Sequence, residues 1–465
     1  MNGTREQRSI LFCRLMEEES NLQRETFKSI LLSVLVLASV AMTWNIWFYK
    51  TDYQNYKGPS ESVKQVAIAE SREASDVIRP YLILRHTGGL TSGQTENSEI
   101  MKAYRLIQNA SFIHAYPIFS RKNIPARDGL TSYEIIFPAP LTQETLKKVF
   151  QFDQNDLSLP NNVRMDRLEV YPSLLKGRPL VAVFRTQDGT ARFYAVINRI
   201  NVDDLQQVLT NRNWIPYSRQ DLMKKRVYLP AVQTKLSGIM TYYEDIPISS
   251  FIPALFNDPN NVFYNRGETA YSDGTRQLEK TGNILQYVNP GISSGSQGET
   301  DPILHSFDFI NNFKGWTDDY MYDGITSSVR NQQDEVVFRM RLGDHLVYNT
   351  EYYPNPYLTT MELIWKNGEL SNLYRTLLNL NPIDEQGTVS LDSGEEMLQK
   401  LRAASVPVNE IQDMDIGYRL TRPQQGNGHY LVLTPDWFYK MDNRWYSATD
   451  ATIPLNVKNE KRNLQ

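Results

Sequence analysis

A run of twenty residues without a formal charge, residues 30–49, constrains this chain more than any other feature of its sequence. Lys28 and Lys50 bracket the run, and four aromatic residues crowd its C-terminal end. As an α-helix the run would be about 30 Å long, which matches the hydrocarbon core of a bilayer. Aromatic rings are stable at the headgroup level. The run therefore predicts one transmembrane helix over residues 29–49, followed by one large polar body.

Two other interpretations of this run stay open, a cleaved signal peptide and a buried helix of a soluble domain. A signal peptide requires a shorter apolar core of roughly 7–15 residues and a small-x-small cleavage site. Ser39 and Ala41 supply such a site, but it lies inside the run. A buried helix is disfavoured because basic residues isolate the run on both sides. A lipoprotein anchor would require a cysteine after the run, and none follows.

The orientation in the membrane rests on two weak signals. Basic residues are almost balanced at the two ends, with a slight preference for a cytoplasmic N-terminus. The only cysteine, Cys13, precedes the run, and a thiol-free body suits an exported domain, although many cytosolic domains also lack cysteine. We expect a single-pass cell membrane protein with residues 1–28 in the cytoplasm and the body outside. Translation could also begin at Met16, which would remove Cys13.

The composition limits the classes of function. The formal net charge of -4 provides no basic field for nucleic acid. With 41% hydrophobic and 11% aromatic residues, the body can bury real cores. The 27 tyrosines indicate either a recognition surface or tyrosine-rich sheets.

Segments typical of strands and helices alternate after residue 61, which predicts an α+β body with mainly antiparallel sheets. Strands are expected at 81–85, 133–138, 235–246, 415–422 and 429–442. Helices are expected at 141–150 after Thr142, at 201–209, at 249–257 after Ser249 or Ser250, at 303–313, and at 393–404 with a capping box from Ser393 to Glu396. Hairpin turns are expected at Asp188-Gly189, Asp273-Gly274, Gly343-Asp344, Asn367-Gly368, and between Gly426 and Gly428.

The domain organisation follows from composition and element order. Residues 50–60 end in Gly-Pro-Ser and are expected to form a tether. The extracytoplasmic α+β body that follows is divided into an N-terminal part at 61–205, a central part at 206–299 and a C-terminal part at 300–465. The Gly/Ser-rich segment 289–301 indicates either the last boundary or a long exposed loop. The strand, helix, hairpin order of the last two domains indicates two copies of one small unit.

The sequence contains no recognisable catalytic, cofactor or metal motif. The five histidines are far apart and lack metal-site spacing, so each is expected to be a surface or hydrogen-bonded structural residue. Asp318, Asp319 and Asp323 lack the alternating ligands of a calcium loop and are expected in a solvated turn. Unpatterned carboxylates could still act in catalysis without leaving a motif. We assign no catalytic, cofactor-binding or metal-binding residue.

The predicted membrane helix carries small or polar side chains on two faces, which in lipid allow close helix packing and hydrogen bonds between helices. One face carries Ser29, Ser33, Val36, Val40, Thr43 and Trp47. The roughly opposite face carries Val34, Ala38, Ala41 and Asn45. A passive anchor also tolerates such residues, so packing and passive anchoring both stay open.

Several segments in combination resemble the YycH family, bitopic membrane proteins of Gram-positive Firmicutes. They are FKSILLSVLVLASVAMTWNIWFY at 27–49, YSDGTRQL at 271–278, NILQYVNP at 283–290, DFINNFKGWTDDY at 308–320 and VVFRMRLGDHLVY at 336–348. The resemblance runs from about Lys28 to about Tyr446. The extension at residues 1–15 departs from the family, so we attach no function to it.

The resemblance implies a three-domain outer body whose last two domains are similar to each other and to YycI. It also implies a non-enzymatic regulator that acts with YycI on the sensor histidine kinase WalK (YycG), partly through membrane-helix contacts. WalK controls cell-wall metabolism through WalR. The expected partners are thus WalK, YycI and membrane lipid, with a homodimer as a further possibility.

Two alternative functions predict different features of the outer body. A membrane-tethered cell-wall enzyme predicts convergent carboxylates, or a Ser/His site, in a cleft. A sensor of a small wall-derived ligand predicts a sizeable apolar pocket with a few polar groups. The regulator predicts scattered ionisable groups and exposed aromatic contact surface.

Overall fold

The computed structural model describes most of the chain. The described residues are 28–40, 42–43, 56–57, 68–117, 131–153, 163–171, 180–186, 188–210, 213–223, 225–292, 300–328, 330–350, 357–421 and 430–452. The chain forms two compact units, Met1–Lys57 and Gly58–Gln465.

The first unit contains a helix and a short strand. Residues 28–40 and 42–43 are helical with exposed side chains, and β1 spans Tyr56–Lys57. In the part of the chain that the structure describes, no helix is long and apolar enough to cross a membrane. The segment predicted to span the membrane, 29–49, extends beyond the described helical residues.

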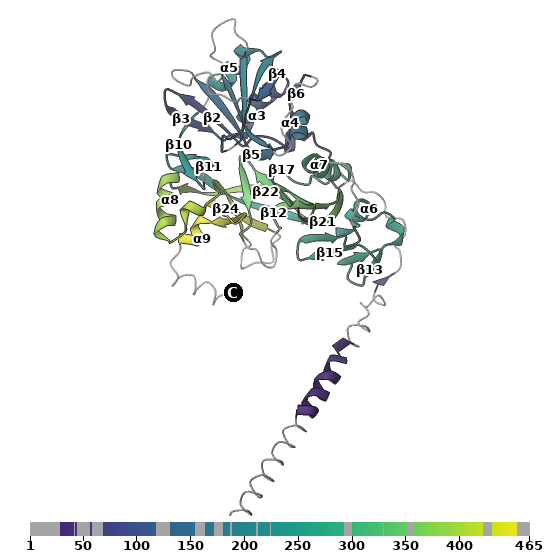
Figure 1. The fold of residues 1–465 in the computed structure, drawn as a ribbon. Coiled ribbons are helices and arrows are strands. Elements are labelled where there is room, and N and C mark those ends of the chain that lie inside the picture. Colours follow the sequence, from purple (N-terminus) through teal and green to yellow (C-terminus); the bar gives the residue numbers. More distant parts are fainter. Residues whose placement is uncertain are drawn as a thin grey trace, which may run out of the picture. The chain divides into compact units, whose positions relative to one another are not determined.

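Ten described strands of the second unit form a first sheet in the order β11-β10-β3-β2-β5-β7-β8-β9-β4-β6 (Figure 1). They are β2 Leu82–Thr87, β3 Leu90–Gln94, β4 Ser111–Pro117, β5 Ser132–Leu141, β6 Gln151–Phe152, β7 Met165–Tyr171, β8 Leu180–Arg185, β9 Arg192–Asn198, β10 Ile215–Leu222 and β11 Lys225–Pro230. All pairs are antiparallel except β4 with β6.

Four helices accompany this sheet: α2 Ala74–Val77, α3 Asn97–Gln108, α4 Gln143–Val149 and α5 Val202–Thr210. Apolar residues recur along α3 at helical spacing, and Ile100, Tyr104 and Ile107 are fully buried in the core shared with the sheet. α5 runs across the boundary predicted at residue 205.

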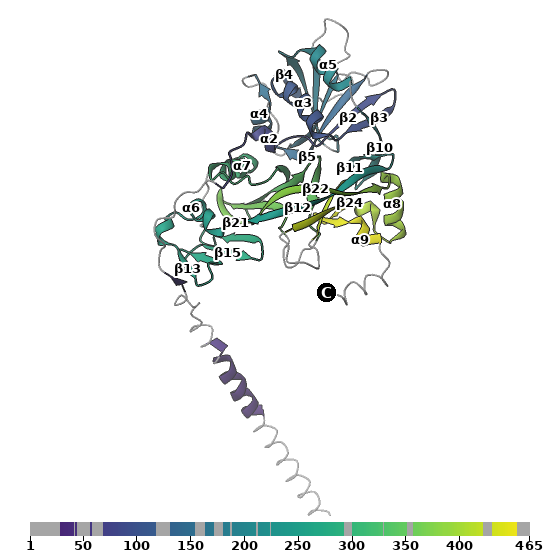
Figure 2. The same cartoon turned by 180° about the vertical axis from the view of Figure 1, so that it is seen from behind.

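A second sheet follows the order β13-β14-β15-β16-β21-β20-β18-β19-β23-β24-β12-β22, with β17 on β18 and β25 on β24 (Figure 2). Its strands are β12 Thr234–Asp245, β13 Phe263–Asn265, β14 Ala270–Ser272, β15 Gln277–Thr281, β16 Ile284–Val288, β17 Tyr320–Ser328, β18 Gln333–Leu342, β19 His345–Tyr348, β20 Thr360–Lys366, β21 Glu369–Thr376, β22 Leu378–Leu391, β23 Asp413–Thr421, β24 Tyr430–Met441 and β25 Arg444–Ser447. Only β19 with β23 is parallel among these described pairs.

Short helices flank this second sheet. They are η3 Ile248–Phe251, α6 Ile252–Leu255, η4 Pro259–Asn261, α7 Pro302–Asn312, α8 Gly394–Ala403, η5 Val408–Glu410 and α9 Ala448–Thr452. The prediction of a mixed α+β body with mainly antiparallel sheets is confirmed. Pairing crosses the boundary predicted at 299/300, because β12 lies between β24 and β22 and β16 pairs with β21. The three-domain division itself stays a prediction.

The local predictions mostly agree with the structure. Asn367 and Gly368 have φ of 52° and 79° between β20 and β21, as a type I′ hairpin turn requires. The hairpins β8–β9, β14–β15 and β18–β19 are also confirmed. The Thr142 hydroxyl accepts a hydrogen bond from the Thr145 amide, and the capping box at Ser393 is present.

One predicted helix start is wrong. The segment expected to begin after Ser249 or Ser250 begins instead with η3 at Ile248, preceded by Pro247, which contributes no side-chain cap. Both serines fall inside the 3-10 turn. The turn at Gly426 and Gly428 and most of the Gly/Ser-rich segment at 289–301 lie outside the described residues.

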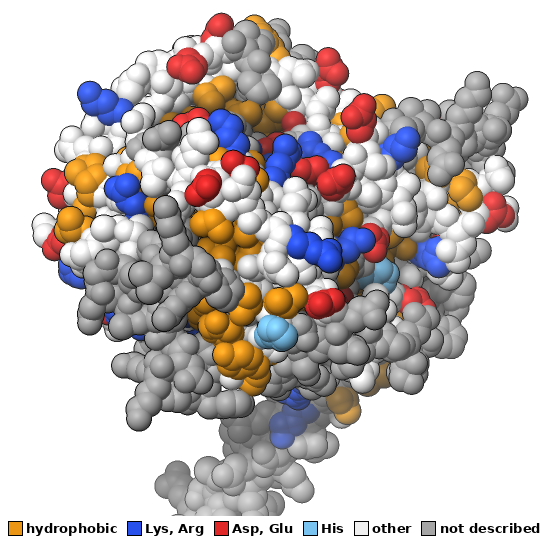
Figure 3. All heavy atoms as spheres, turned by 90° about the horizontal axis from the view of Figure 1, so that it is seen from above, with side chains coloured by type: hydrophobic (Ala, Val, Ile, Leu, Met, Phe, Trp, Pro, Cys, Tyr) orange, Lys and Arg blue, Asp and Glu red, His pale blue; other side chains and the backbone are white. Residues whose placement is uncertain are grey.

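The surface and the core account for much of the composition. On the face shown in Figure 3, Lys and Arg side chains lie among Asp and Glu, as the nearly balanced charge implies. Ten described tyrosines are buried. The tyrosine surplus therefore serves the sheets to a large extent, which favours the second of the two interpretations above.

Candidate functional site

The predicted packing residues of the membrane helix lie only partly within the described residues. Ser29, Ser33, Val34, Val36, Ala38, Val40 and Thr43 are helical and exposed. The Ser33 hydroxyl donates to the Ser29 carbonyl, and the Thr43 hydroxyl donates to the Ser39 carbonyl, both at 2.8 Å. Ala41, Asn45 and Trp47 lie outside the described residues. The two packing faces stay a prediction.

A polar cavity of about 340 Å³ lies between the first and second sheets of the body. Side chains of β5, β7 and β11 line it from the first sheet, and side chains of β17, β18, β20, β23, β24 and β25 line it from the second. Its charged lining residues are Asp166, Arg167, Lys225, Asp323, Glu335, Arg339, Glu362, Asp413 and Lys440. Its volume is in the range of small-molecule sites, which often lie where two structural units meet.

The wall on the side of the first sheet rests on a buried ion-pair network around Glu134 of β5. Its carboxylate accepts hydrogen bonds from Arg167 at 3.1 Å and Arg185 at 3.0 Å, and lies 2.8 Å from Nε2 of His86. Burial opposes ionisation of Glu134, but Arg185, His86 and Arg167 outweigh it and hold its pKa well below the usual range. Arg185 also pairs with Glu169 at 2.9 Å. This network fixes Arg167 at the edge of the cavity.

Asp166, the neighbour of Arg167 on β7, has a different environment. Its side chain is 6% exposed, and Oδ2 lies 4.0 Å from Nε of Arg167. Oδ1 is buried and has no hydrogen-bond partner among the described residues. Burial raises the pKa of Asp166 to about 7, although Arg167 opposes the shift. An acid that titrates near neutral pH therefore lines the cavity.

The wall on the side of the second sheet carries further acids whose pKa is raised. Burial, followed by the charge of Glu335, raises the pKa of Glu362 to about 7. Burial also raises the pKa of Glu335 and of Asp413. The carboxylate of Asp323 accepts a hydrogen bond from Arg339 at 2.8 Å. Three acids of this wall, Glu335, Glu362 and Asp413, therefore hold a proton more tightly than a free carboxylic acid does.

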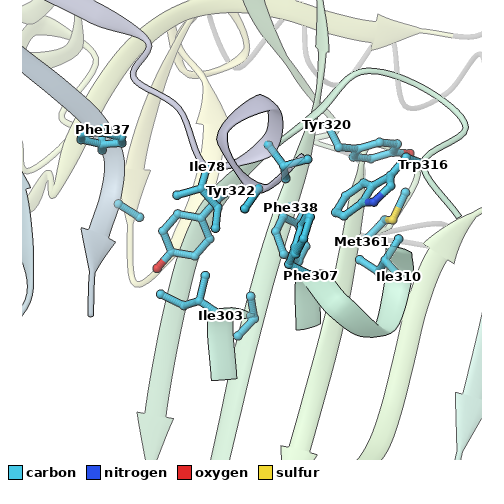
Figure 4. Packing of buried hydrophobic residues seen from close by; sticks show 14 of the residues in the cluster. Ile78, Phe137, Ile303, Phe307, Ile310, Trp316, Tyr320, Tyr322, Phe338 and Met361 are labelled. Atoms are coloured by element: carbon cyan, nitrogen blue, oxygen red, sulfur yellow. The ribbon is translucent and has the colours of Figure 1, made fainter. Parts of the chain in front are cut away.

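The two sheets meet at a packed junction beside the cavity. Figure 4 shows Tyr322 of β17 beside Ile78, with Phe338 continuing the same core. The Tyr322 hydroxyl donates to the Pro140 carbonyl of β5 at 2.9 Å. This junction holds the cavity walls together.

The aspartates expected in a solvated turn lie instead at this junction, so that prediction is wrong. Asp319 pairs with Arg72 at 3.1 Å, Arg79 at 2.6 Å and Arg341 at 2.9 Å. Asp318 accepts from the Leu380 amide at 3.0 Å, and burial raises its pKa to about 6. These contacts could not be predicted from the sequence, because the arginine partners of Asp319 are distant from it in the chain.

The histidines in the described residues have the structural or surface roles expected. His86 belongs to the Glu134 network, His305 stacks on Trp365 at 3.8 Å, and Nδ1 of His345 lies 3.3 Å from the Ile416 carbonyl oxygen. His114 is exposed, and His429 lies outside the described residues. Within the described ranges, no three His, Cys, Asp or Glu residues are placed to hold a metal ion.

Sequence reasoning missed the cavity and its residues. The strand β7, MDRLEVY, is fully buried, but its alternating charges are typical of a segment that faces water. Charged residues inside a β-rich segment are the only local signal. The cavity is polar, unlike the apolar pocket expected for a ligand sensor, and its convergent carboxylates are a feature expected of the enzyme alternative.

Comparisons with known proteins assign the chain to a family. The model of the YycH protein N-terminal domain matches residues 25–213, and the model of the C-terminal domain matches residues 224–453. The two-component system WalR/WalK regulatory protein YycH of Bacillus subtilis (strain 168) is 20% identical over 460 residues, covering 91% of this chain and 96% of that protein. The crystal structure of YycH from Bacillus subtilis shares the fold, with a TM-score of 0.68 and 16% identity over 82% of this chain and 98% of that one. Since the two domain models together span nearly the whole sequence, the resemblance is confirmed and this chain belongs to the YycH family.

Proposed function

We propose that this chain is a non-enzymatic, membrane-anchored regulator of the sensor histidine kinase WalK. Two observations of one kind carry the proposal. Both YycH domain models match this chain, and its relative in Bacillus subtilis is named a WalR/WalK regulatory protein. The proposal includes YycI as a second partner, a single membrane helix at 29–49, a cytoplasmic N-terminus and an extracytoplasmic body.

The described part of the first helix supports the anchor. The helix exposes its own apolar side chains, including Leu32 with an exposed fraction of 64% and Leu37 with 68%. Such a surface is costly in water and stable in lipid. The hydroxyls of Ser33 and Thr43 already donate within the helix, so neither donor would be left unsatisfied in a membrane.

A modest helix contact is sufficient for regulation. Interhelical hydrogen bonds in membranes contribute about 1 kcal/mol. A shift of about 1.4 kcal/mol changes a two-state equilibrium tenfold, so contacts of this size can bias a kinase between two states.

Replacement of residues 29–49 by an unrelated apolar span of equal length tests the helix contact. We expect WalK-dependent transcription to lose its response to this protein while the body stays folded and accessible to a membrane-impermeant label outside the cell. Unchanged kinase output with a correctly displayed body would contradict helix packing as the mechanism.

Single substitutions separate the two faces of the helix. Ser33→Phe and Ala38→Phe should weaken crosslinking to different partners, WalK or YycI. Leu35→Phe is the matched control, because Leu35 lies on neither face. Equal loss of both crosslinks in both variants would rule out separate faces.

The convergent carboxylates favour one second candidate, a cell-wall hydrolase. Its test is release of soluble fragments from purified cell wall by the full-length chain, with Glu362→Gln as the inactive control. Release that Glu362→Gln abolishes would replace the regulatory proposal by an enzymatic one.

A further inference from the structure

The charges lining the polar cavity do not balance. Five lining acids face four lining bases. Arg167 is already engaged by Glu134, and Asp323 is engaged by Arg339. The remaining acids are Asp166, Glu335, Glu362 and Asp413, and the remaining bases are Lys225 and Lys440. Counted over the described lining residues and with these four acids ionised, the cavity carries an excess of negative charge, which disfavours an anion and favours a cation.

Asp166 is the acid of the first-sheet wall that the protein compensates least. Its side chain is more than nine-tenths buried, and its Oδ1 atom has no hydrogen-bond partner among the described residues. A buried carboxylate without a full set of partners costs several kcal/mol when ionised, and native proteins normally satisfy such groups. Asp166 lines the cavity, so a positively charged ligand beside it would offset part of the cost of its ionised form.

The rest of the lining restricts the kind of cation. Neutral hydrogen-bonding side chains alternate with the charges, namely Asn349, Thr359, Thr360, Gln412 and Asn443. Two aromatic residues, Tyr81 and Trp445, also contribute. A volume of about 340 Å³ exceeds what a bare ion occupies and accommodates a small organic molecule. Ammonium groups are compact donors with three N–H bonds and suit several separated acceptors.

We propose that the cavity binds a small organic cation that carries a primary ammonium group, with Asp166 on the first sheet and Glu362 on the second as its main acceptors. The ligand would contact both sheets at once and so stabilise their packing. The site is independent of the regulatory proposal, because binding is measured on the protein without WalK.

The test is calorimetric titration of the full-length chain in detergent at pH 8. The probe is 1,5-diaminopentane, and glutarate is the control of equal length with carboxylates in place of amines. Calcium chloride alone serves as the inorganic control. We expect binding of the diamine and no binding of glutarate.

Two charge-removing variants and one control variant test whether the diamine binds in this cavity. Asp166→Asn and Glu362→Gln keep the side-chain shapes, remove the charges and should weaken diamine binding at least tenfold. Asp384→Asn is the matched control, because Asp384 is exposed on β22 and outside the cavity. It should leave binding unchanged.

A cavity-filling pair keeps the test valid if a charge variant misfolds. Gly324 lines the cavity, and a Cβ atom placed there meets no atom within 4 Å. Gly324→Leu should therefore be accommodated and should block binding, whereas Gly387→Leu, at an equally open site on exposed β22, should not.

Three results would overturn the proposal. The first is no diamine binding, or binding that survives both Gly324→Leu and the charge variants. The second is equal binding of glutarate. The third is a signal from calcium alone that Asp166→Asn removes, which would assign the cavity to a metal ion.

Discussion

Glu134 and Asp166 are both buried acids on paired strands of the first sheet, yet burial has opposite consequences for them. Glu134, 2% exposed, has three partners, and its pKa lies well below the usual range. Asp166, 6% exposed, has one arginine at 4.0 Å, and its pKa is raised to about 7. The number and distance of cationic partners, rather than burial itself, decides the charge state.

This difference separates a structural region from a region that can accept a ligand. Around Glu134 the partners are already in place, so a new molecule has nothing to satisfy. Asp166 is buried as well, but its nearest cationic group among the described residues is 4.0 Å away and its Oδ1 accepts no hydrogen bond from them. Substitutions at these two acids and at their neighbours test this distinction.

Glu134→Gln should have the largest effect. The substitution leaves Arg167 buried with Asp166 at 4.0 Å as its remaining acidic partner among the described residues, beside the Arg226 carbonyl at 2.7 Å. Breaking a buried ion pair from one side costs about 3–5 kcal/mol. We expect the free energy of unfolding, measured by urea denaturation of the full-length chain at pH 7, to fall by this amount. A decrease in the free energy of unfolding below about 1 kcal/mol would mean that the ion-pair network around Glu134 contributes little to the stability of the first sheet.

Asp166→Asn should have the opposite sign and depend on pH. The folded pKa of about 7 lies above the value of 3.8 for a free aspartate, so the favourable contribution of the protonated form is fully present only below pH 3.8 and is lost progressively as pH rises from there to about 7. Asparagine cannot ionise. The variant should therefore be more stable than the parent by about 4 kcal/mol at pH 8, and by less than half of that amount at pH 5.

The same urea titrations at the two pH values check this sign. If Asp166→Asn destabilises the chain at pH 8, Asp166 is a working partner of Arg167, and the distinction between the two acids fails.

His86→Phe should have an intermediate effect. It keeps a ring beside Tyr228 but removes the nitrogen 2.8 Å from the Glu134 carboxylate. A hydrogen bond to a charged group contributes about 1.5 kcal/mol or slightly more, and we expect this loss in the unfolding free energy. His305→Phe is the control, because His305 stacks on Trp365 and should lose less.

Asp221→Asn should have the smallest effect. Its pair with Arg219 is 2.8 Å long but has side chains 61% and 48% exposed. Exposed pairs of this kind contribute little, so the change should be below about 0.5 kcal/mol. A larger loss would show that exposure does not separate the important pairs from the others.

The sequence predicted those features whose cause is local. The turn at Asn367 and Gly368 and the cap at Ser393 depend on residues adjacent in the chain, and both are confirmed. The start at Ser249 or Ser250 failed because Pro247 begins the turn earlier.

The cavity could not be predicted because its walls come from distant strands. Asp166 and Glu362 approach the same space only after β7 and β20 are placed in different sheets. For the same reason, the partners of Asp319 could not be recognised near it in the chain. The family resemblance succeeded because it compares whole segments and needs no account of these contacts.

The position of β12 has a consequence for the order in which the chain can fold. Ile239 of β12 pairs with Leu433 of β24, nearly two hundred residues later in synthesis. Until β22 and β24 are made, both edges of a twelve-residue strand lack their partners. Open edges promote association between chains, and such distant pairing slows folding. The second sheet can therefore close only when the chain is almost complete, and a ribosome that stalls before residue 430 would release a strongly aggregating product.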